Sequence, residues 1–214
     1  IPVSIIGTTA HTLTIQGRAN TTYQVQYTDS KNPLQGEAGT VSTNDNGVGT
    51  TAHLAERNTS YTIVNQNKPQ EKVTGSTALV DAKLIAERFA NQGETTNQTL
   101  TQDGNDEAAT NSNVTVTRGA DGNYTAALRK AIQGTIEIPD TWGTVTLDLN
   151  GKTIKGADAS QTQAAQAALY FIPDTTAKHS GTTLTVINGK ILGGNGNANY
   201  PNGAPAVVTA AGAK

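Results

Sequence analysis

One passage of this chain recurs after 38 residues. The run Asn-Gly-Lys at 150–152 returns at 188–190, and the apolar segment at 168–172 returns at 206–210. A fixed period that contains three short strands is typical of a solenoid, in which each layer needs its neighbours to bury its apolar face. The repeat therefore predicts a stack of similar layers in the C-terminal half of the chain.

The strand before the first Asn-Gly pair has a clear two-residue period. Within Thr144–Leu149, the apolar residues Val145, Leu147 and Leu149 alternate with Thr144, Thr146 and Asp148. Period-two alternation marks a strand with one buried face and one wet face. We therefore expect the three apolar side chains to point into the stack.

The N-terminal third is a succession of short strands. Tyr23, Val25 and Tyr27 alternate with polar residues, and Asn44-Asp45-Asn46-Gly47 separates two further strand-like segments. Asn-Gly tolerates positive φ at consecutive positions, so this run predicts a hairpin. About six strands at such spacing favour a β-sandwich over residues 1–66.

Residues 67–112 have a different pattern, which predicts a connector with one helix. Apolar residues in 78–90 recur at helical spacing and end near Asn91-Gln92-Gly93. Residues 94–112 contain almost no apolar side chain, which is typical of a linker or surface loop.

Composition excludes several classes of function. The chain has 35 Thr, 19 Asn and 22 Gly among its 214 residues, but only 15% charged residues and no Cys. Thr suits strands and Asn and Gly suit turns, so the composition predicts a mainly β protein. A formal net charge of −2 with scattered basic residues argues against a nucleic-acid partner. No apolar run has the length of a membrane span.

Two segments resemble known families. A predicted short helix with Ala-Leu-x-x-Ala-Ile (127–132), then Gly, Ile-Glu-Ile-Pro and Leu-Asp-Leu-Asn-Gly-Lys-Thr-Ile, resembles the start of a pectate-lyase-like right-handed parallel β-helix. In that family an amphipathic helix caps the first coil. The run at 41–50, followed by Tyr-x-Ile-Val, resembles bacterial Ig-like surface modules. The resemblance implies an Ig-like β-sandwich (1–66), a connector with one helix (67–112), and the N-terminal cap and first coils of a truncated β-helix (113–214).

These resemblances imply an extracellular bacterial surface protein. We expect a structural and adhesive role that includes binding to a polysaccharide or a host-surface glycan. The alternative is the N-terminal portion of a carbohydrate-active β-helix enzyme, a polysaccharide lyase or glycoside hydrolase. The chain starts without Met and holds about two repeats, so we expect a piece of a longer protein whose open coil end could pair with another chain.

Candidate catalytic residues come from the outward positions of the coil. The alternation places Glu137, Asp148 and Lys152 at or near the outer surface. In polysaccharide lyases of this fold, acidic residues on such a face hold Ca²⁺ and a basic residue abstracts a proton. The acidic residue at 148 is not repeated 38 residues later, so a solvated strand face is the simpler interpretation.

A second candidate is a calcium loop. Asp103, Asn105 and Glu107 alternate oxygen-bearing side chains, as calcium-binding loops do. The full EF-hand pattern fails, because Ala108 and Val114 stand where it requires Gly and Glu. The three histidines are far apart in sequence and predict no metal site.

Two aromatic residues are candidates for sugar binding. Trp142 lies in Pro139-Asp-Thr-Trp-Gly143, and Tyr200 lies in Asn199-Tyr-Pro201, both of which are predicted turns. An exposed ring there could stack on a pyranose, whereas a buried ring would only pack locally.

Overall fold

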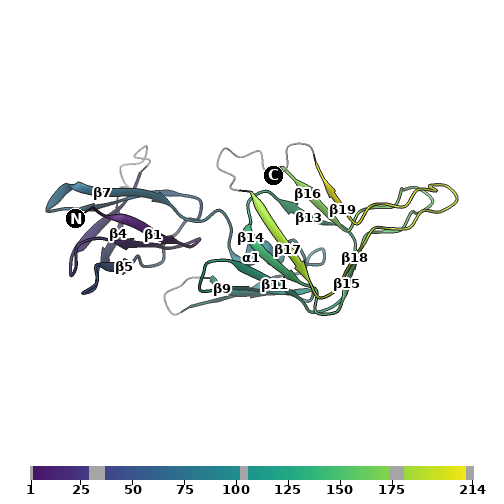
Figure 1. The fold of residues 1–214 in the computed structure, drawn as a ribbon, viewed down its shortest axis with the longest axis horizontal. Helices are drawn as coiled ribbons and strands as arrows, with labels where there is room; N and C mark the ends of the chain where they lie inside the picture. The colour runs from purple at the N-terminus through teal and green to yellow at the C-terminus, as the bar shows by residue number, and fades with distance from the viewer. Residues whose placement is uncertain (1, 29–36, 102–105, 174–180, 211–214) are drawn as a thin grey trace. The chain divides into compact units, whose positions relative to one another are not determined.

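The computed structural model describes residues 2–28, 37–101, 106–173 and 181–210 (Figure 1). Strands account for 46% of the residues and helix for 3%, so the prediction of a mainly β protein is confirmed.

The first compact unit holds residues 1–81 and 100–106 and contains two antiparallel sheets. One sheet has the strand order β1-β2-β5, and the other has the order β4-β3-β6-β7. The bounds are β1 Ser4–Thr8, β2 Leu13–Gln16, β3 Thr22–Tyr27, β4 Glu37–Ser42, β5 Val48–Thr50, β6 Ser60–Asn65 and β7 Lys68–Ser76. β7 falls in the segment expected to be a connector, but it pairs with β6 along its length, so the unit extends to Asp81.

Both sheets contribute side chains to one hydrophobic core. Leu13 and Ile15 of β2 pack in the same cluster as Tyr23 and Val25 of β3, and all four are fully buried. Tyr23 and Val25 of β3 therefore face the core, as the alternation predicts. Gln24, which was expected on the wet face, is also buried, and its Oε1 accepts a hydrogen bond from the side chain of Gln66.

The predicted hairpin at 44–47 is wrong in its pairing. A tight turn does form, because the Gly47 amide donates to the Asn44 carbonyl at 2.9 Å and Gly47 has a φ of 78°. However, β4 pairs with β3 and β5 pairs with β2, so the turn crosses from one sheet to the other. Asn-Gly determined the local turn, whereas competition between neighbouring strands decided the pairing.

A bidentate ion pair joins the loop after β2 to strand β7. Arg18 Nε lies 2.7 Å from Glu71 Oε1 and 3.0 Å from Oε2, and Arg18 Nη2 lies 2.6 Å from Oε1. Asn65 Nδ2 donates a further hydrogen bond to Glu71 Oε2 at 3.1 Å. The hydrogen bond from Arg18 lowers the pKa of Glu71 from 4.5 to about 2, since donors favour the charged carboxylate.

This pair predicts acid sensitivity of the first unit. Because the folded-state pKa of Glu71 is depressed, its contribution to stability is present above pH 4.5 and is lost as the pH falls towards 2. We expect Glu71→Gln to lower the melting temperature at pH 7 and to flatten the decline between pH 4.5 and 2. Asp45→Asn, in the exposed turn, is the control. Melting curves of both variants from pH 7 to 2 test this, and identical pH profiles for Glu71→Gln and the unaltered chain would contradict it.

The second compact unit holds residues 82–99 and 107–214. Its largest sheet has the order β17-β14-β11-β10-β9-β8, and two smaller sheets have the orders β12-β15-β18 and β13-β16-β19. The bounds are α1 Ala82–Glu87, β8 Asn97–Leu100, β9 Asp106–Thr110, β10 Val114–Arg118, β11 Tyr124–Leu128, β12 Ile132–Gln133, β13 Ile136–Pro139, β14 Gly143–Asp148, β15 Thr153–Lys155, β16 Leu169–Ile172, β17 Thr182–Ile187, β18 Lys190–Leu192 and β19 Val207–Thr209.

From β11 onward the chain visits the three sheets in the same order three times (Figure 1). The first layer is β11-β12-β13, the second is β14-β15-β16, and the third is β17-β18-β19. Strands of successive layers pair in parallel, and we call residues 124–210 the three-sheet stack. Leu169 pairs with Val207, which is the 38-residue shift seen in the sequence.

Apolar side chains fill the inside of the stack. Val145, Leu147 and Leu149 are fully buried, as the alternation predicts. Asn150 and Asn188 both have positive φ, at 50° and 60°, and the Gly151 amide donates to the Asn188 carbonyl. The two Asn-Gly turns therefore lie one above the other.

Inward side chains of the third layer are more exposed to solvent than those of the second layer. Leu147 and Leu169 are buried, but their partners Val186 and Val207 are 37% and 45% exposed. Core positions of this layer thus face solvent, and β17, β18 and β19 are edge strands of their sheets.

The helix expected within residues 124–132 is not present. Tyr124, Ala126 and Leu128 are buried along strand β11, and Ile132 belongs to β12. The segment fits both the helical and the two-residue period, and pairing of β11 with β10 and β14 selects the strand. The helix of this unit is instead α1, which packs against β10 and β11 and has Ile85 and Ala86 buried.

The linker expected over residues 94–112 is also wrong, because it contains strands β8 and β9. Polar side chains order it in place of apolar ones. Asn111 Nδ2 donates to the Ala86 carbonyl at 2.7 Å, and Asn113 Nδ2 donates to the Phe89 carbonyl at 2.5 Å. Glu94 accepts bonds from the hydroxyl and amide of Ser112, which lower the pKa of Glu94.

Candidate functional site

A groove of about 400 Å³ lies on the outside of the sheet β13-β16-β19. We call it the β13–β19 groove. Its lining residues are Thr135, Glu137, Ala165, Gln166, Ala167, Tyr170, Ala204, Pro205 and Val208. Its volume is within the range of small-ligand sites, about 300–1,000 Å³.

The floor of the groove comes from one register position in three layers. Glu137 of β13 pairs with Tyr170 of β16, which pairs with Val208 of β19. Each of these follows an inward position of its strand, so the strand alternation turns all three outward. The Glu137 side chain is 58% exposed, and Arg88 Nη1 lies 3.7 Å from its Oε2.

The walls come from the chain segments that precede β16 and β19. Gly156 and Gly193 let these segments fold back closely, because a Cβ at Gly156 would overlap the Gln166 carbonyl oxygen and one at Gly193 would overlap that of Ala204. The hydroxyl of Thr135 donates to the Ala167 carbonyl at 2.6 Å and ties the wall to the floor. The resulting groove combines an aromatic ring, a carboxylate and an amide, which are groups that stack on and hydrogen-bond to a polar ring.

The structure places one of the three predicted catalytic residues in this groove. Glu137 lines it, whereas Asp148 ends β14 in a different sheet. Asp148 Oδ1 accepts bonds from the Asn150 amide at 2.9 Å and from Asn188 Nδ2 at 3.3 Å. Lys152 lies in the turn after Asp148, where its carbonyl accepts a bond from the Lys190 amide. The three predicted catalytic residues therefore do not converge on one site.

The two predicted aromatic residues have different surroundings. Trp142 is 3% exposed, and its ring lies 6.2 Å from that of Phe89, so no face is available for a sugar. Tyr200 is half-buried, and its hydroxyl donates to the Thr162 carbonyl at 3.1 Å in the long loops of the stack.

Tyr170, which the sequence analysis missed, is the aromatic residue of the groove. The continuous apolar run Leu169–Ile172 gave no alternation that marks Tyr170 as outward, and its place beside Glu137 comes from the pairing of β13 with β16.

The predicted calcium loop lies largely outside the described residues. Asp103 and Asn105 fall there, and only the backbone of Glu107, in β9, is described. Over the described part of the chain, no group of three or more His, Asp or Glu side chains could hold a metal ion. His179 also lies outside the described residues.

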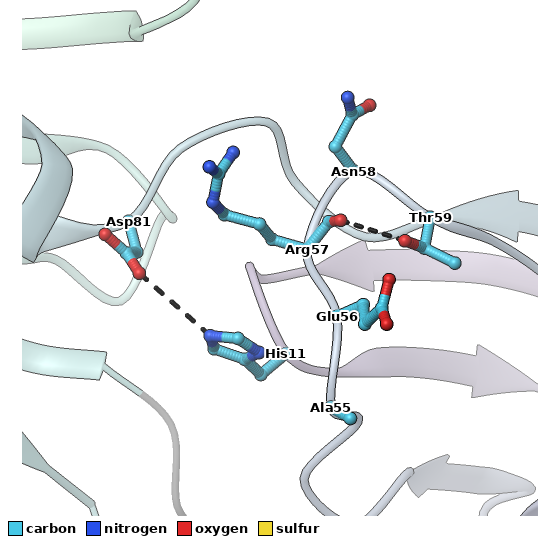
Figure 2. Close-up of a pocket in the computed structure, with 7 residues that line it drawn as sticks. All are labelled: His11, Ala55, Glu56, Arg57, Asn58, Thr59 and Asp81. Carbon is cyan, nitrogen blue, oxygen red and sulfur yellow. Dashed lines mark hydrogen bonds and ion pairs between the residues drawn. The ribbon is translucent and has the colours of Figure 1, made fainter.

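A second, polar pocket of about 520 Å³ lies in the first unit and contains His11 (Figure 2). His11 Nδ1 lies 2.9 Å from the Leu54 carbonyl, and His11 Nε2 lies 4.0 Å from Asp81 Oδ2. Arg57 Nη1 donates to the Leu79 carbonyl at 2.8 Å. The rings of His11 and His53, which are far apart in the sequence, stack with their centroids 4.4 Å apart. Internal contacts thus already engage His11 and Arg57, so the β13–β19 groove is the better candidate for ligand binding.

Two further findings bear on the class of protein. Among the described residues, no helix is both long enough and apolar enough to cross a membrane. Comparisons with protein families, curated proteins and solved structures found no match for this chain.

Proposed function

We propose that this chain is part of an extracellular bacterial surface protein with a structural and adhesive role. In this proposal the first unit is an Ig-like sandwich, and the three-sheet stack is the start of a right-handed parallel β-helix capped by α1. Two sheets with a shared core and three parallel layers support this interpretation. Both units act as a scaffold that displays a binding surface.

The ligand in this proposal is a glycan held in the β13–β19 groove. The observation that carries it is the alignment of Glu137, Tyr170 and Val208 on neighbouring strands. Tyr170 supplies an aromatic face, and Glu137 and Gln166 supply hydrogen-bonding groups beside it. Such a combination favours a polar ring with one apolar face.

The alternative is the N-terminal portion of a polysaccharide lyase or glycoside hydrolase. The exposed carboxylate of Glu137 favours it, because such a group can act in proton transfer. Glycoside hydrolysis usually uses a pair of carboxylates. Within the described part of the chain, Glu137 is the one carboxylate that lines the groove, which favours binding without cleavage.

A panel of insoluble and soluble polysaccharides, with and without Ca²⁺, tests the proposal. We expect depletion of the protein from solution without new reducing ends or unsaturated products. Tyr170→Ala should weaken retention about tenfold, because an apolar contact worth about 1.4 kcal/mol corresponds to that factor. Tyr170→Phe keeps the ring and is the matched control.

The outcomes separate the two functions. New reducing ends or unsaturated products that Glu137→Gln abolishes would favour the enzyme. Equal retention of Tyr170→Ala and Tyr170→Phe would contradict the groove as the binding site.

We also propose self-association through the third layer. The exposed Val186 and Val207 and the edge strands β17, β18 and β19 support it, because unpaired strand edges with apolar side chains favour pairing with another chain.

A further inference from the structure

Threonine residues line up across the outer face of the large sheet. Thr117 of β10 pairs with Thr125 of β11, Thr125 pairs with Thr146 of β14, and Thr146 pairs with Thr185 of β17. A second row joins Thr144 to Thr183 on β14 and β17. We call these six residues the threonine face. The four strands are neighbours in the sheet order β17-β14-β11-β10, and Figure 1 labels three of them, β11, β14 and β17.

The hydroxyls of this face are available to solvent. Thr146 is half-buried, and the other five residues are exposed. In the first unit, cross-strand threonines bond to one another, as in Thr28–Thr62 at 2.8 Å and Thr62–Thr74 at 3.0 Å. Among the described residues, none donates to or accepts from the hydroxyls of the threonine face.

The spacing of the face follows from strand geometry. Neighbouring strands are about 4.8 Å apart, and alternate residues along one strand are about 6.7 Å apart. A water molecule about 2.8 Å from each of two hydroxyls spans about 4.6 Å at a tetrahedral angle. One water molecule would therefore fit between each pair of neighbouring hydroxyls in a row, and successive waters would follow the strand spacing.

We propose that the threonine face binds ice. Each hydroxyl can donate and accept a hydrogen bond as water does. The strand spacing of about 4.8 Å is close to the distance of about 4.6 Å between two oxygens that share one tetrahedrally bonded water molecule, which is the arrangement of neighbouring water molecules in ice. None of the six side chains is charged or aromatic, which separates this face from the β13–β19 groove. Asp148, which pairs with Ala127 on one side and Ile187 on the other, marks its border.

Partition into slowly growing ice tests this inference on the full chain. The protein is expected to become enriched in the ice fraction, and Thr146→Tyr is expected to lose that enrichment because a ring at the centre blocks flat contact. Thr146→Val keeps the side-chain shape and should retain part of the enrichment, whereas Thr74→Tyr places the same ring on a strand of the first unit as the matched control. Circular dichroism establishes that each variant is folded, and Thr183→Lys replaces Thr146→Tyr if that variant unfolds.

The result can also overturn the inference. Exclusion of the unaltered chain from ice would do so, as would equal enrichment of Thr146→Tyr and Thr74→Tyr. Retention on an insoluble polysaccharide that depends on Thr146 without any ice binding would assign the face to a glycan instead. Loss of glycan binding by Tyr170→Ala leaves the ice result unchanged, so the two proposals fail independently.

Discussion

Leu149→Asp is expected to unfold the second unit while the first unit stays folded. Leu149 is fully buried, and the backbone of Gly189 in the next layer lies against its side chain. An unpaired carboxylate at this position costs several kcal/mol, out of a total folding free energy of about 5–15 kcal/mol. Each layer buries its apolar side chains against the neighbouring layers. Unfolding of one layer therefore destabilises the whole three-sheet stack.

Limited proteolysis followed by mass spectrometry measures this effect. We expect rapid cleavage within residues 107–214 and a protected fragment that ends near Asp81. Thr144→Asp, on an exposed position of the same strand, is the control and should leave both units protected. Simultaneous cleavage of both units in Leu149→Asp would show that they unfold as one.

Gly156→Ala is expected to destabilise the second unit and to disrupt the β13–β19 groove. A Cβ at this position would overlap the Gln166 carbonyl oxygen, and both groups belong to backbone that cannot rotate away. The Gly156 amide also donates to the Leu192 carbonyl at 2.9 Å, so a shift of Gly156 strains the next layer. Overpacking of this kind costs about 1–3 kcal/mol.

The matched control is Gly151→Ala. Gly151 has a φ of 76°, and a methyl group at this position would meet no atom within 4 Å apart from those of the adjacent residues, so the substitution costs only the left-handed strain. That strain is worth about 1–2 kcal/mol. We expect a larger drop in melting temperature and weaker glycan retention for Gly156→Ala. The reverse order of melting temperatures would contradict steric crowding at Gly156.

The sequence predicted the fold correctly in segments where the spacing of apolar residues fits only one type of secondary structure. The alternation of Val145, Leu147 and Leu149 correctly identified the buried face of β14, because that pattern fits a strand alone. The Asn-Gly turns at 150 and 188 marked equivalent positions of two layers, since their positive φ restricts the residues that fit.

The same reasoning failed where two periods coexist or where polar bonds replace apolar contacts. Residues 124–132 fit both a helix and a strand, and only pairing with β10 and β14 selected the strand. Residues 94–112 show no apolar pattern. Asn111 and the adjacent Asn113 order this segment instead, through hydrogen bonds to the backbone carbonyls of Ala86 and Phe89. Hydrogen bonds between distant segments leave no periodic signal in a sequence.

By itself, the sequence determined a mainly β chain, the 38-residue repeat and the outward position of Glu137, because these depend on residue type and spacing along one strand. Only the tertiary structure decided which outward residues become neighbours. It brought Tyr170 and Val208 beside Glu137, separated Asp148 from them, and aligned the six threonines on one sheet. The physical reason is that register between strands depends on the lengths of the intervening loops and on competition among all available edges, neither of which a local pattern contains.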